Sequence, residues 1–498
     1  MQILPPVAHR SLAWEALILM SVFNPRPYQK LILDFIRDNP RCNVFASPGM
    51  GKTSSSLAAF SELQLFGEVN KALVLAPKRV ALTSWPDEVR KFRGSFGHLK
   101  IAAAIGTPAQ RLAALHSEHD VLTINYENIP WLIEQCGENW PYDMIIADEV
   151  SRVRGLRVSL QQRKRKDGTL GKAFIAGQGA SRAAALARVA HTKVKRWVGL
   201  TGSPAPNGLQ CLWAIQWYID AGKRLGTSYS AFTQRWFRPA WGSTPEQQRF
   251  EPLPHAQAEI QRLLRECSIT VDAKDWFDIK APVEQHIEID LPPTARKQYE
   301  EMERELFSYI DEHPLEVFNA GSRTLKLLQL ASGSVIVDDK GSWSAVHDQK
   351  LQALESLVEE LAGENVLVAY QFRADAERIL KAFPFARMLD SHPQTVRDFQ
   401  QGKIRMLLAH PKSAGHGLDL QHNCRVLIDY SSGWNLEEDE QIIERIGPTR
   451  QAQIGKDVAV LRYRIVARGT IEQTAVLPAL QRKMSVQDAL KAAMKISR

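Results

Sequence analysis

One short segment has the residue types and spacing of a phosphate-binding loop. Ala46-Ser-Pro-Gly-Met-Gly-Lys-Thr53 follows an apolar run at 43–46 and precedes a helical run at 54–66, although Ala46 replaces the first glycine of the strict pattern. The two glycines would let backbone N–H groups turn toward phosphate oxygens at a helix N-terminus. Lys52 would place a positive charge at the β- and γ-phosphates, and the Thr53 hydroxyl would ligate Mg²⁺. The segment predicts a site for ATP and Mg²⁺ made by Pro48, Gly49, Met50, Gly51, Lys52, Thr53 and Ser54.

An acidic pair supplies the second half of such a site. Asp148 and Glu149 directly follow the apolar run Asp143–Ala147, which predicts a buried strand. At the carboxyl end of that strand, Asp148 would hold Mg²⁺ through water, and Glu149 would polarise the attacking water. We therefore expect Lys52, Asp148 and Glu149 to be catalytic, with Thr53 and Asp148 at the metal.

These residues need a parallel sheet to position them. Short apolar runs alternate with helical patterns across 40–205 and again across 350–470, which predicts an α/β fold with two parallel-sheet lobes. The strands expected in the first region are Asn43–Ala46, Ala72–Ala76, Val121–Asn125, Asp143–Ala147 and Arg196–Leu200. Those expected in the second are Val366–Tyr370, Met406–Ala409, Arg425–Asp429 and Val458–Ile465.

The region between the lobes differs in composition. It is rich in aromatic residues at 213–241 and has a helical pattern over Pro293–His313, so we expect a mostly helical insertion. The aromatic spacing favours a small core over a base-stacking surface. The predicted organisation is an N-terminal extension at 1–22, a first lobe at 23–222, the insertion and linker at 223–345, a second lobe at 346–475 and a C-terminal helix at 476–498.

The charge distribution points to an anionic partner. The chain has 63 Lys and Arg against 55 Asp and Glu, a net charge of +8. Residues 152–196 contain thirteen cations against Asp167, a net charge of +12, and Gln161–Gly168 within them is predicted as a mobile basic loop. Nucleic acid is the expected partner, through phosphate contacts that are salt-sensitive and blind to sequence. The alternative is a solvated loop whose charge only maintains solubility.

Composition excludes several classes of protein. With 44% hydrophobic and 24% charged residues, the chain is neither disordered nor collagen-like. Its five cysteines have no metal-ligand spacing, which predicts a reduced cytoplasmic compartment without a zinc site. No apolar run is long enough for a transmembrane helix. Leu12–Phe23 resembles a signal-peptide core but contains Glu15 and lacks a cleavage pattern, and Met20 is a possible start of translation.

The chain resembles the Swi/Snf-type ATPases of helicase superfamily two, which translocate on double-stranded DNA, over about Phe23 to Val476. In the first half, the segments that carry the resemblance are Arg26-Pro-Tyr-Gln29, the phosphate-binding loop, Val74–Lys78 with Trp85 and Glu88, Thr123-Ile-Asn-Tyr126, Asp148-Glu-Val-Ser151 and Leu200-Thr-Gly-Ser-Pro204. In the second half they are Ser413–Leu420, Trp434-Asn435 and Gln441–Gln451. Three positions depart from the family pattern: Ser151 stands for His, Asp419 for Asn, and Pro448 for the second arginine, while Arg450 follows two residues later.

The resemblance implies two RecA-like lobes with ATP bound between them. It places Gln29 and Gly417 at the nucleotide, makes Arg445 and Arg450 candidates for the arginine finger, and assigns Thr201, Ser203 and Gln441 to the coupling of ATP state to DNA grip. The residues expected at the nucleic acid, including those of the basic loop, are Lys78, Arg79, Thr123, Arg163, Lys164, Arg165, Lys166 and Trp434. The compact chain is similar to bacteriophage and bacterial forms, which implies the cytoplasm of a bacterial host.

The function expected from the resemblance is ATP-dependent translocation on double-stranded DNA, which remodels DNA or DNA–protein complexes in replication, recombination or repair. A strand-separating helicase on DNA or RNA is a second hypothesis. A third is a nucleotide-gated DNA-binding subunit with weak catalysis, which the departure at Pro448 keeps open. The sequence names neither the preferred DNA structure nor a protein that recruits the chain, and it identifies no membrane partner.

Overall fold

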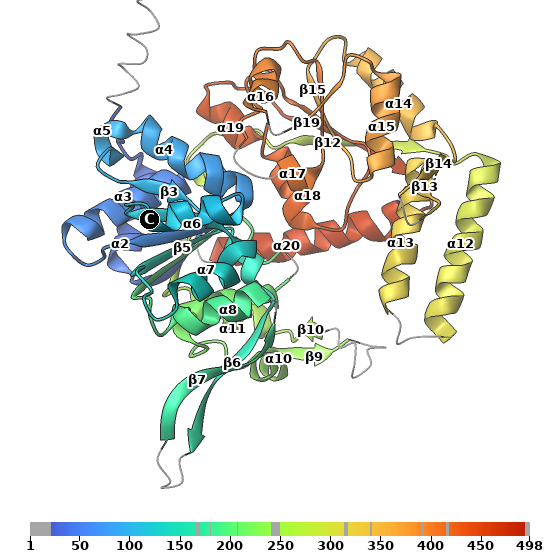
Figure 1. Ribbon diagram of the computed structural model, residues 1–498. Helices are drawn as coiled ribbons and strands as arrows, with labels where there is room; N and C mark the ends of the chain where they lie inside the picture. The colour runs from blue at the N-terminus through green and yellow to red at the C-terminus, as the bar shows by residue number, and fades with distance from the viewer. Residues whose placement is uncertain are drawn as a thin grey trace, which may run out of the picture. The chain divides into compact units, whose positions relative to one another are not determined.

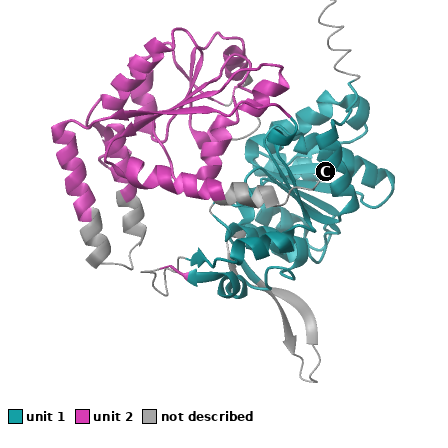
Figure 2. Ribbon diagram, turned by 180° about the vertical axis from the view of Figure 1, so that it is seen from behind, with its two compact units in different colours: residues 1–238, 250–276, 486–498 teal, residues 239–249, 277–485 magenta. Residues whose placement is uncertain are grey.

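The computed structural model describes residues 21–164, 170–179, 181–206, 208–240, 250–312, 317–338, 341–390, 392–414 and 418–493. The chain divides into two compact units, shown in different colours in Figure 2. Unit 1 comprises residues 1–238, 250–276 and 486–498, and unit 2 comprises residues 239–249 and 277–485. Residues 223–345, expected as an insertion, thus contribute to both units.

A seven-stranded parallel sheet forms the centre of unit 1 (Figure 1). Its strand order is β11-β1-β8-β5-β2-β4-β3. The strands are β1 (Arg41–Ala46), β2 (Ala72–Ala76), β3 (Ile101–Ala103), β4 (Val121–Asn125), β5 (Met144–Asp148), β8 (Arg196–Thr201) and β11 (Ser268–Val271). All five strands expected here are confirmed, because each is an apolar run buried on both faces. Strands β3 and β11 were not predicted.

Helices connect these strands, and two further strand pairs extend unit 1: the antiparallel hairpin β6–β7 and the pair β9–β10. The helices are α2 (Pro27–Asp38), α3 (Lys52–Leu65), α4 (Trp85–Lys91), α5 (Arg93–Phe96), α6 (Pro108–His116), α7 (Ile129–Cys136), α8 (Ser181–Ala190), α9 (Cys211–Asp220), α10 (Tyr229–Trp236) and α11 (Ala256–Leu264). Short helical turns are η1 (Val80–Ser84, a π-helix), η2 (Tyr126–Asn128), η3 (Val150–Val153) and η4 (Ala273–Asp275). The added strands are β6 (Leu156–Lys164), β7 (Leu170–Gly179), β9 (Phe237–Pro239) and β10 (Phe250–Pro252).

The interpretation of Gln161–Gly168 as one continuous loop is wrong for its first four residues. Gln161, Gln162 and Lys164 pair in register with β7, so the β6–β7 hairpin includes half of that segment. The basic run concealed the strand because its charges remove the apolar alternation by which a strand is recognised. Arg165 and Lys166 lie outside the described residues.

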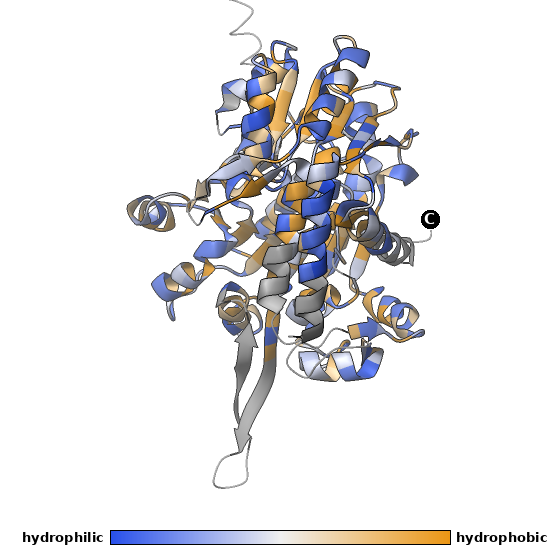
Figure 3. Ribbon diagram, turned by 90° about the vertical axis from the view of Figure 1, so that its right-hand side faces the viewer, coloured by the Kyte–Doolittle hydropathy of each residue, from blue (hydrophilic) through white to orange (hydrophobic). Residues whose placement is uncertain are grey.

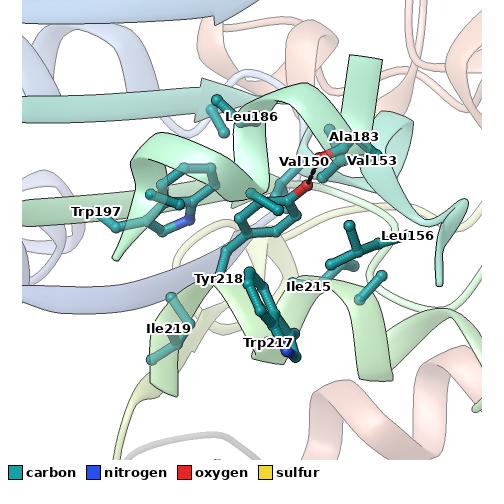
Figure 4. Close-up of a cluster of buried hydrophobic side chains, with 14 of the residues drawn as sticks. Val150, Val153, Leu156, Ala183, Leu186, Trp197, Ile215, Trp217, Tyr218 and Ile219 are labelled. Atoms are coloured by element: carbon teal, nitrogen blue, oxygen red, sulfur yellow. Dashed lines mark hydrogen bonds between the residues drawn. The ribbon is translucent and has the colours of Figure 1, made fainter. Parts of the chain in front are cut away.

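The aromatic residues of 213–237 form part of the core of unit 1, as predicted. Trp213, Trp217, Tyr218 and Trp236 are fully buried in one hydrophobic cluster. Figure 4 shows Tyr218 beside Trp197, whose ring stacks on it at a centroid distance of 4.6 Å, while the Tyr218 hydroxyl donates to the Ala183 carbonyl at 2.8 Å. These side chains fill space between α9 and the sheet and are not available as base-stacking surfaces.

Unit 2 is built on a six-stranded parallel sheet with the order β12-β19-β18-β15-β17-β16. The strands are β12 (Val283–Ile289), β15 (Val366–Ala369), β16 (Arg387–Met388), β17 (Met406–Ala409), β18 (Val426–Asp429) and β19 (Leu461–Ala467). The four expected strands are confirmed, with β19 beginning three residues later than expected. Together the two sheets confirm the predicted α/β class with two parallel-sheet lobes.

Helices and a small hairpin complete unit 2. The helices are α12 (Pro293–Glu312), α13 (Val317–Ser332), α14 (Gln349–Glu360), α15 (Arg373–Ala382), α16 (Pro393–Gln400), α17 (Pro411–Ala414), α18 (Leu436–Ile443), α19 (Pro448–Gln453), η5 (Glu472–Val476, a π-helix) and α20 (Leu477–Ala493, which continues into residues assigned to unit 1). The hairpin pairs β13 (Ser334–Ile336) with β14 (Trp343–Ala345). Figure 3 shows hydrophobic residues concentrated along the strands while the helices alternate in polarity. Among the described residues, no helix is long and apolar enough to span a lipid bilayer.

Candidate nucleotide site

The phosphate-binding loop lies between the end of β1 and the start of α3. Gly49 and Gly51 have φ angles of 81° and 70°, a left-handed conformation that favours glycine. The Lys52 ammonium lies against the loop, where it donates to the Ala46 carbonyl at 2.7 Å. Met50 is fully buried beneath it. The loop therefore has the strand–turn–helix geometry that the sequence predicted.

Gln29, in the first turn of α2, lies directly on this loop. A Cβ atom built on Gly51 would come within 2.1 Å of the Gln29 amide nitrogen. The Gln29 side-chain oxygen accepts a hydrogen bond from the Arg26 backbone N–H at 2.9 Å, which fixes its orientation. Only glycine at 51 leaves room for this amide, so the structure brings Gln29 to the loop.

Asp148 is the last residue of β5 and is almost fully buried. Burial raises the pKa of its carboxyl group, while the Trp85 indole and the Lys52 charge act in the opposite direction. The indole N–H of Trp85 donates to Asp148 Oδ2 at 3.0 Å. The Tyr126 hydroxyl donates to the Asp148 backbone carbonyl at 2.8 Å. Side chain and backbone of Asp148 are thus both held by neutral donors.

Glu149 adopts a backbone conformation that non-glycine residues rarely take. Its φ is 59°, and such strain is found where a site requires one side-chain direction. Its carboxylate accepts a hydrogen bond from the Thr201 hydroxyl at 3.1 Å, and Thr201 in turn accepts from the Ser203 backbone N–H at 3.1 Å. The structure therefore joins the expected water-polarising acid to two of the three residues expected in coupling.

The donor set fits ATP with Mg²⁺. The Thr53 hydroxyl at the start of α3 and the Asp148 carboxylate are oxygen ligands of the kind that Mg²⁺ prefers. The positive charge of Lys52 also acts to lower the pKa of the Asp148 carboxyl group. Ser54 is buried, and its hydroxyl donates to the Gly51 carbonyl at 3.3 Å within the loop.

In unit 2, the expected finger arginines lie at a turn between two short helices. Arg445 follows α18, is buried, and donates from Nε to the Gln441 carbonyl at 3.0 Å. Pro448 is the first residue of α19, a position where its missing N–H costs nothing. Arg450, in the first turn of α19, forms an ion pair with Asp419. Two departures from the family pattern therefore contact each other. Gly417 lies outside the described residues.

A buried ionic network behind α18 was not predicted. Asp439 accepts hydrogen bonds from both Arg462 and Arg464, at 2.6 to 3.0 Å, and the same arginines contact Asp429. Arg464 Nε also donates to Glu284 at 2.6 Å. Two arginines at alternate positions of one buried strand were the available sign of this network, because they point to the same face of the sheet.

The residues expected at the nucleic acid differ in accessibility. Lys78 is exposed and Arg79 is partly buried, but Thr123 is fully buried and donates to the Ala81 carbonyl at 2.6 Å. Trp434 is partly buried and packs against a hydrophobic cluster of unit 2. The side chains of Arg163 to Lys166 lie outside the described residues.

Part of the basic segment is neutralised locally. Among its described side chains, four cations form ion pairs with acids of unit 1: Arg182 with Glu127, Lys193 with Glu138, Lys195 with Asp143 and Arg196 with Glu68. Arg196 is also buried and donates to two backbone carbonyls of α2. The net charge of +12 therefore overstates the charge that an external polyanion meets.

Comparisons with known proteins address the family. Residues 349–449 match the model of the helicase conserved C-terminal domain. Putative protein p41 of Acyrthosiphon pisum secondary endosymbiont phage 1 is 45% identical over 96% of this chain and 100% of its own length. The chromatin-remodeling ATPase INO80 of Aspergillus oryzae is 30% identical over 27% of this chain, and the aligned region spans a tenth of that longer protein. The Sulfolobus solfataricus SWI2/SNF2 ATPase core in complex with dsDNA aligns over 99% of this chain and 96% of its own at 18% identity and a TM-score of 0.42.

Proposed function

We propose that this chain couples ATP hydrolysis to translocation on double-stranded DNA. It belongs to the Swi/Snf-type helicase-like ATPases and to the same family as phage protein p41. Remodelling of DNA or DNA–protein complexes in replication, recombination or repair is the proposed use of that movement. The proposed compartment is the cytoplasm of a bacterial host.

The observation that carries the proposal is the contact of Thr201 with Glu149. Thr201 and Ser203 belong to the segment expected to report the state of the phosphates to the nucleic-acid grip, and Glu149 is the expected water-polarising acid. The 3.1 Å hydrogen bond between Thr201 and Glu149 would link the hydrolysis of ATP to the binding of DNA. The exposed Lys78 and the basic segment at 152–196 support DNA phosphate as the partner.

The chain's own residues account for the chemistry as follows. When bound, Mg²⁺ would neutralise phosphate charge, with Thr53 and Asp148 as the residues that hold it. Lys52 orients the β- and γ-phosphates, and Glu149 positions the attacking water and takes up its proton. Arg445 or Arg450 stabilises the charge of the transition state, and Gln441 takes part in coupling.

The test is steady-state ATP hydrolysis without nucleic acid and with duplex DNA, single-stranded DNA or RNA. We expect a large increase with duplex DNA alone and a loss of at least about 100-fold in Lys52→Ala, because one phosphate-binding charge disappears. Exposed Lys381 and Arg387 provide matched controls, as Lys381→Ala and Arg387→Ala. Of Arg445→Ala and Arg450→Ala, the variant with the greater loss identifies the finger.

Movement is tested separately from hydrolysis. A translocase displaces a third strand from a triplex without opening the duplex beneath it, whereas a strand-separating helicase opens the duplex. Stimulation only by single strands or RNA, with duplex opening, would replace our proposal by the helicase. ATP binding without turnover on any substrate would leave a nucleotide-gated binding subunit.

A further inference from the structure

One continuous helical segment begins at the expected DNA contacts and ends at the metal site of unit 1. Lys78 and Arg79 start it directly after β2, the π-helix η1 follows, and α4 continues it from Trp85. The backbone stays right-handed helical from Arg79 into Trp85 without an intervening turn. π-Helical turns are rare and occur frequently at functional sites. A displacement at Lys78 therefore has a direct mechanical path to Trp85.

Trp85 contacts the metal site through a polar atom. Its ring is fully buried, and its indole N–H donates to Asp148 Oδ2 at 3.0 Å. A hydrogen bond to a carboxylate in a buried environment is of the strong, orienting kind. It fixes the orientation of the carboxylate that would hold Mg²⁺.

Strand β4 and the turn η2 that follows it hold both ends of this arrangement in place. The Thr123 hydroxyl donates to the Ala81 carbonyl inside the π-helix at 2.6 Å, which supports the widened turn. Three residues further, the Tyr126 hydroxyl donates to the Asp148 carbonyl at 2.8 Å. Thr123 is thus an internal tie to the segment that carries Lys78.

We infer that Trp85 is a positioning residue that orients Asp148 for Mg²⁺ and transmits DNA contact at Lys78 and Arg79 to that carboxylate. The inference rests on the proposed function and deepens it, since it names the link by which duplex DNA stimulates hydrolysis. It also gives the Trp85 side chain a role that core packing alone does not require.

The test compares Trp85→Phe with Trp217→Phe. Both tryptophans are fully buried in unit 1, but the indole nitrogen of Trp217 has no hydrogen-bond partner among the described residues. The two substitutions remove the same ring volume, and only one removes a hydrogen bond. Circular dichroism and thermal melting establish that both variants fold.

The first readout is equilibrium binding of a fluorescent ATP analogue as Mg²⁺ is titrated, which requires no turnover. In Trp85→Phe we expect the half-saturating Mg²⁺ concentration to rise at least about tenfold, the lower end of the effect of losing a hydrogen bond to a charged group. Trp217→Phe should match the wild type. Tyr126→Phe, which frees the Asp148 carbonyl, should show a smaller rise and serves as the second variant if Trp85→Phe does not fold.

The second readout is the ratio of ATPase rates with and without duplex DNA. This ratio should fall in Trp85→Phe by several-fold more than the basal rate does. Wild-type Mg²⁺ affinity in Trp85→Phe, or an equal loss in Trp217→Phe, overturns the inference. A wild-type chain that duplex DNA does not stimulate overturns the proposed function instead, while the Mg²⁺ titration still tests the contact of Trp85 with Asp148.

Discussion

Asp148 in unit 1 and Asp439 in unit 2 are both buried carboxylates, but their partners differ in charge. Asp148 accepts a hydrogen bond from a neutral indole, and burial raises the pKa of its carboxyl group. Asp439 lies between Arg462 and Arg464, and their charges hold its pKa below the ordinary value despite burial. The negative charge of Asp439 is matched inside the protein, whereas that of Asp148 is only partly offset by Lys52. An incompletely compensated carboxylate is suited to an external cation, and a fully compensated one to holding structure.

The largest effect on the free energy of unfolding is expected from disrupting the buried ionic network around Asp439. Asp439→Asn leaves the two buried guanidinium groups with Asp429 as their one remaining shared carboxylate, which should cost about 3 kcal/mol of the free energy of unfolding. Because the pKa of Asp439 is lowered on folding, its contribution is present above about pH 4 and is lost as the pH falls below that value. Hydrogen exchange of peptides covering 426–467 measures the loss locally.

The control for that experiment is an exposed pair. Lys297 and Glu301 form an i,i+4 pair at 4.0 Å, and both are mostly exposed, so Glu301→Gln should leave exchange at 426–467 unchanged. Equal protection in Asp439→Asn and the wild type would show that the network does not secure α18.

A smaller effect is expected from the backbone fit of the phosphate-binding loop. Gly51→Ala places a side chain on a backbone of positive φ and forces Gln29 away. The free energy of unfolding should fall by about 2 kcal/mol, and ATP binding should weaken about tenfold or more. Gly67→Ala is the matched control, since its φ of 73° is similar but no atom lies within 4 Å of the added Cβ. Calorimetric ATP titration of both variants isolates the contact with Gln29. Equal ATP affinity in the two variants would contradict a role for that contact.

The smallest expected effect is an increase in the free energy of unfolding. Because folding raises the pKa of Asp148, its charged form is disfavoured, and stability falls as the pH rises from about 4 through the raised pKa. Asp148→Asn should therefore stabilise unit 1 by about 1 kcal/mol at neutral pH without Mg²⁺, while activity is lost. Melting temperatures with and without MgATP measure this. A destabilised Asp148→Asn chain at pH 7 would show that the carboxylate is internally compensated after all.

The sequence predicted much of unit 1 because its site residues follow apolar runs that only buried parallel strands explain. Ala46 and Asp148 end such runs, and the structure has them at the ends of β1 and β5, which lie on either side of β8 in one sheet. Strand β12 escaped prediction, since Glu284, Gln285 and His286 give it a polar, exposed pattern and its partner β19 lies far along the chain.

The contacts between side chains were harder to predict than the elements. Trp85 and Asp148 are separated by 63 residues, and nothing in either local pattern specifies the hydrogen bond between them. Thr123 was expected at the nucleic acid because Thr123–Tyr126 resembles a motif of the family, but Thr123 is buried and its hydroxyl donates to the Ala81 carbonyl. Asp419 was predicted only as a departure from the family pattern and Arg450 only as a candidate finger, and the fold pairs the two.

The position of β1 in its sheet has a consequence for synthesis of the chain. This strand, which leads into the phosphate-binding loop, pairs with β8 on one side and β11 on the other. Ser47, just after β1, contacts Asp272, 225 residues further along. At about 5 to 20 residues per second, a ribosome needs roughly 10 to 45 s to supply that partner. During this interval one edge of β1 stays open, so newly made chains depend on chaperones or on temporary cover of that edge to avoid edge-to-edge aggregation.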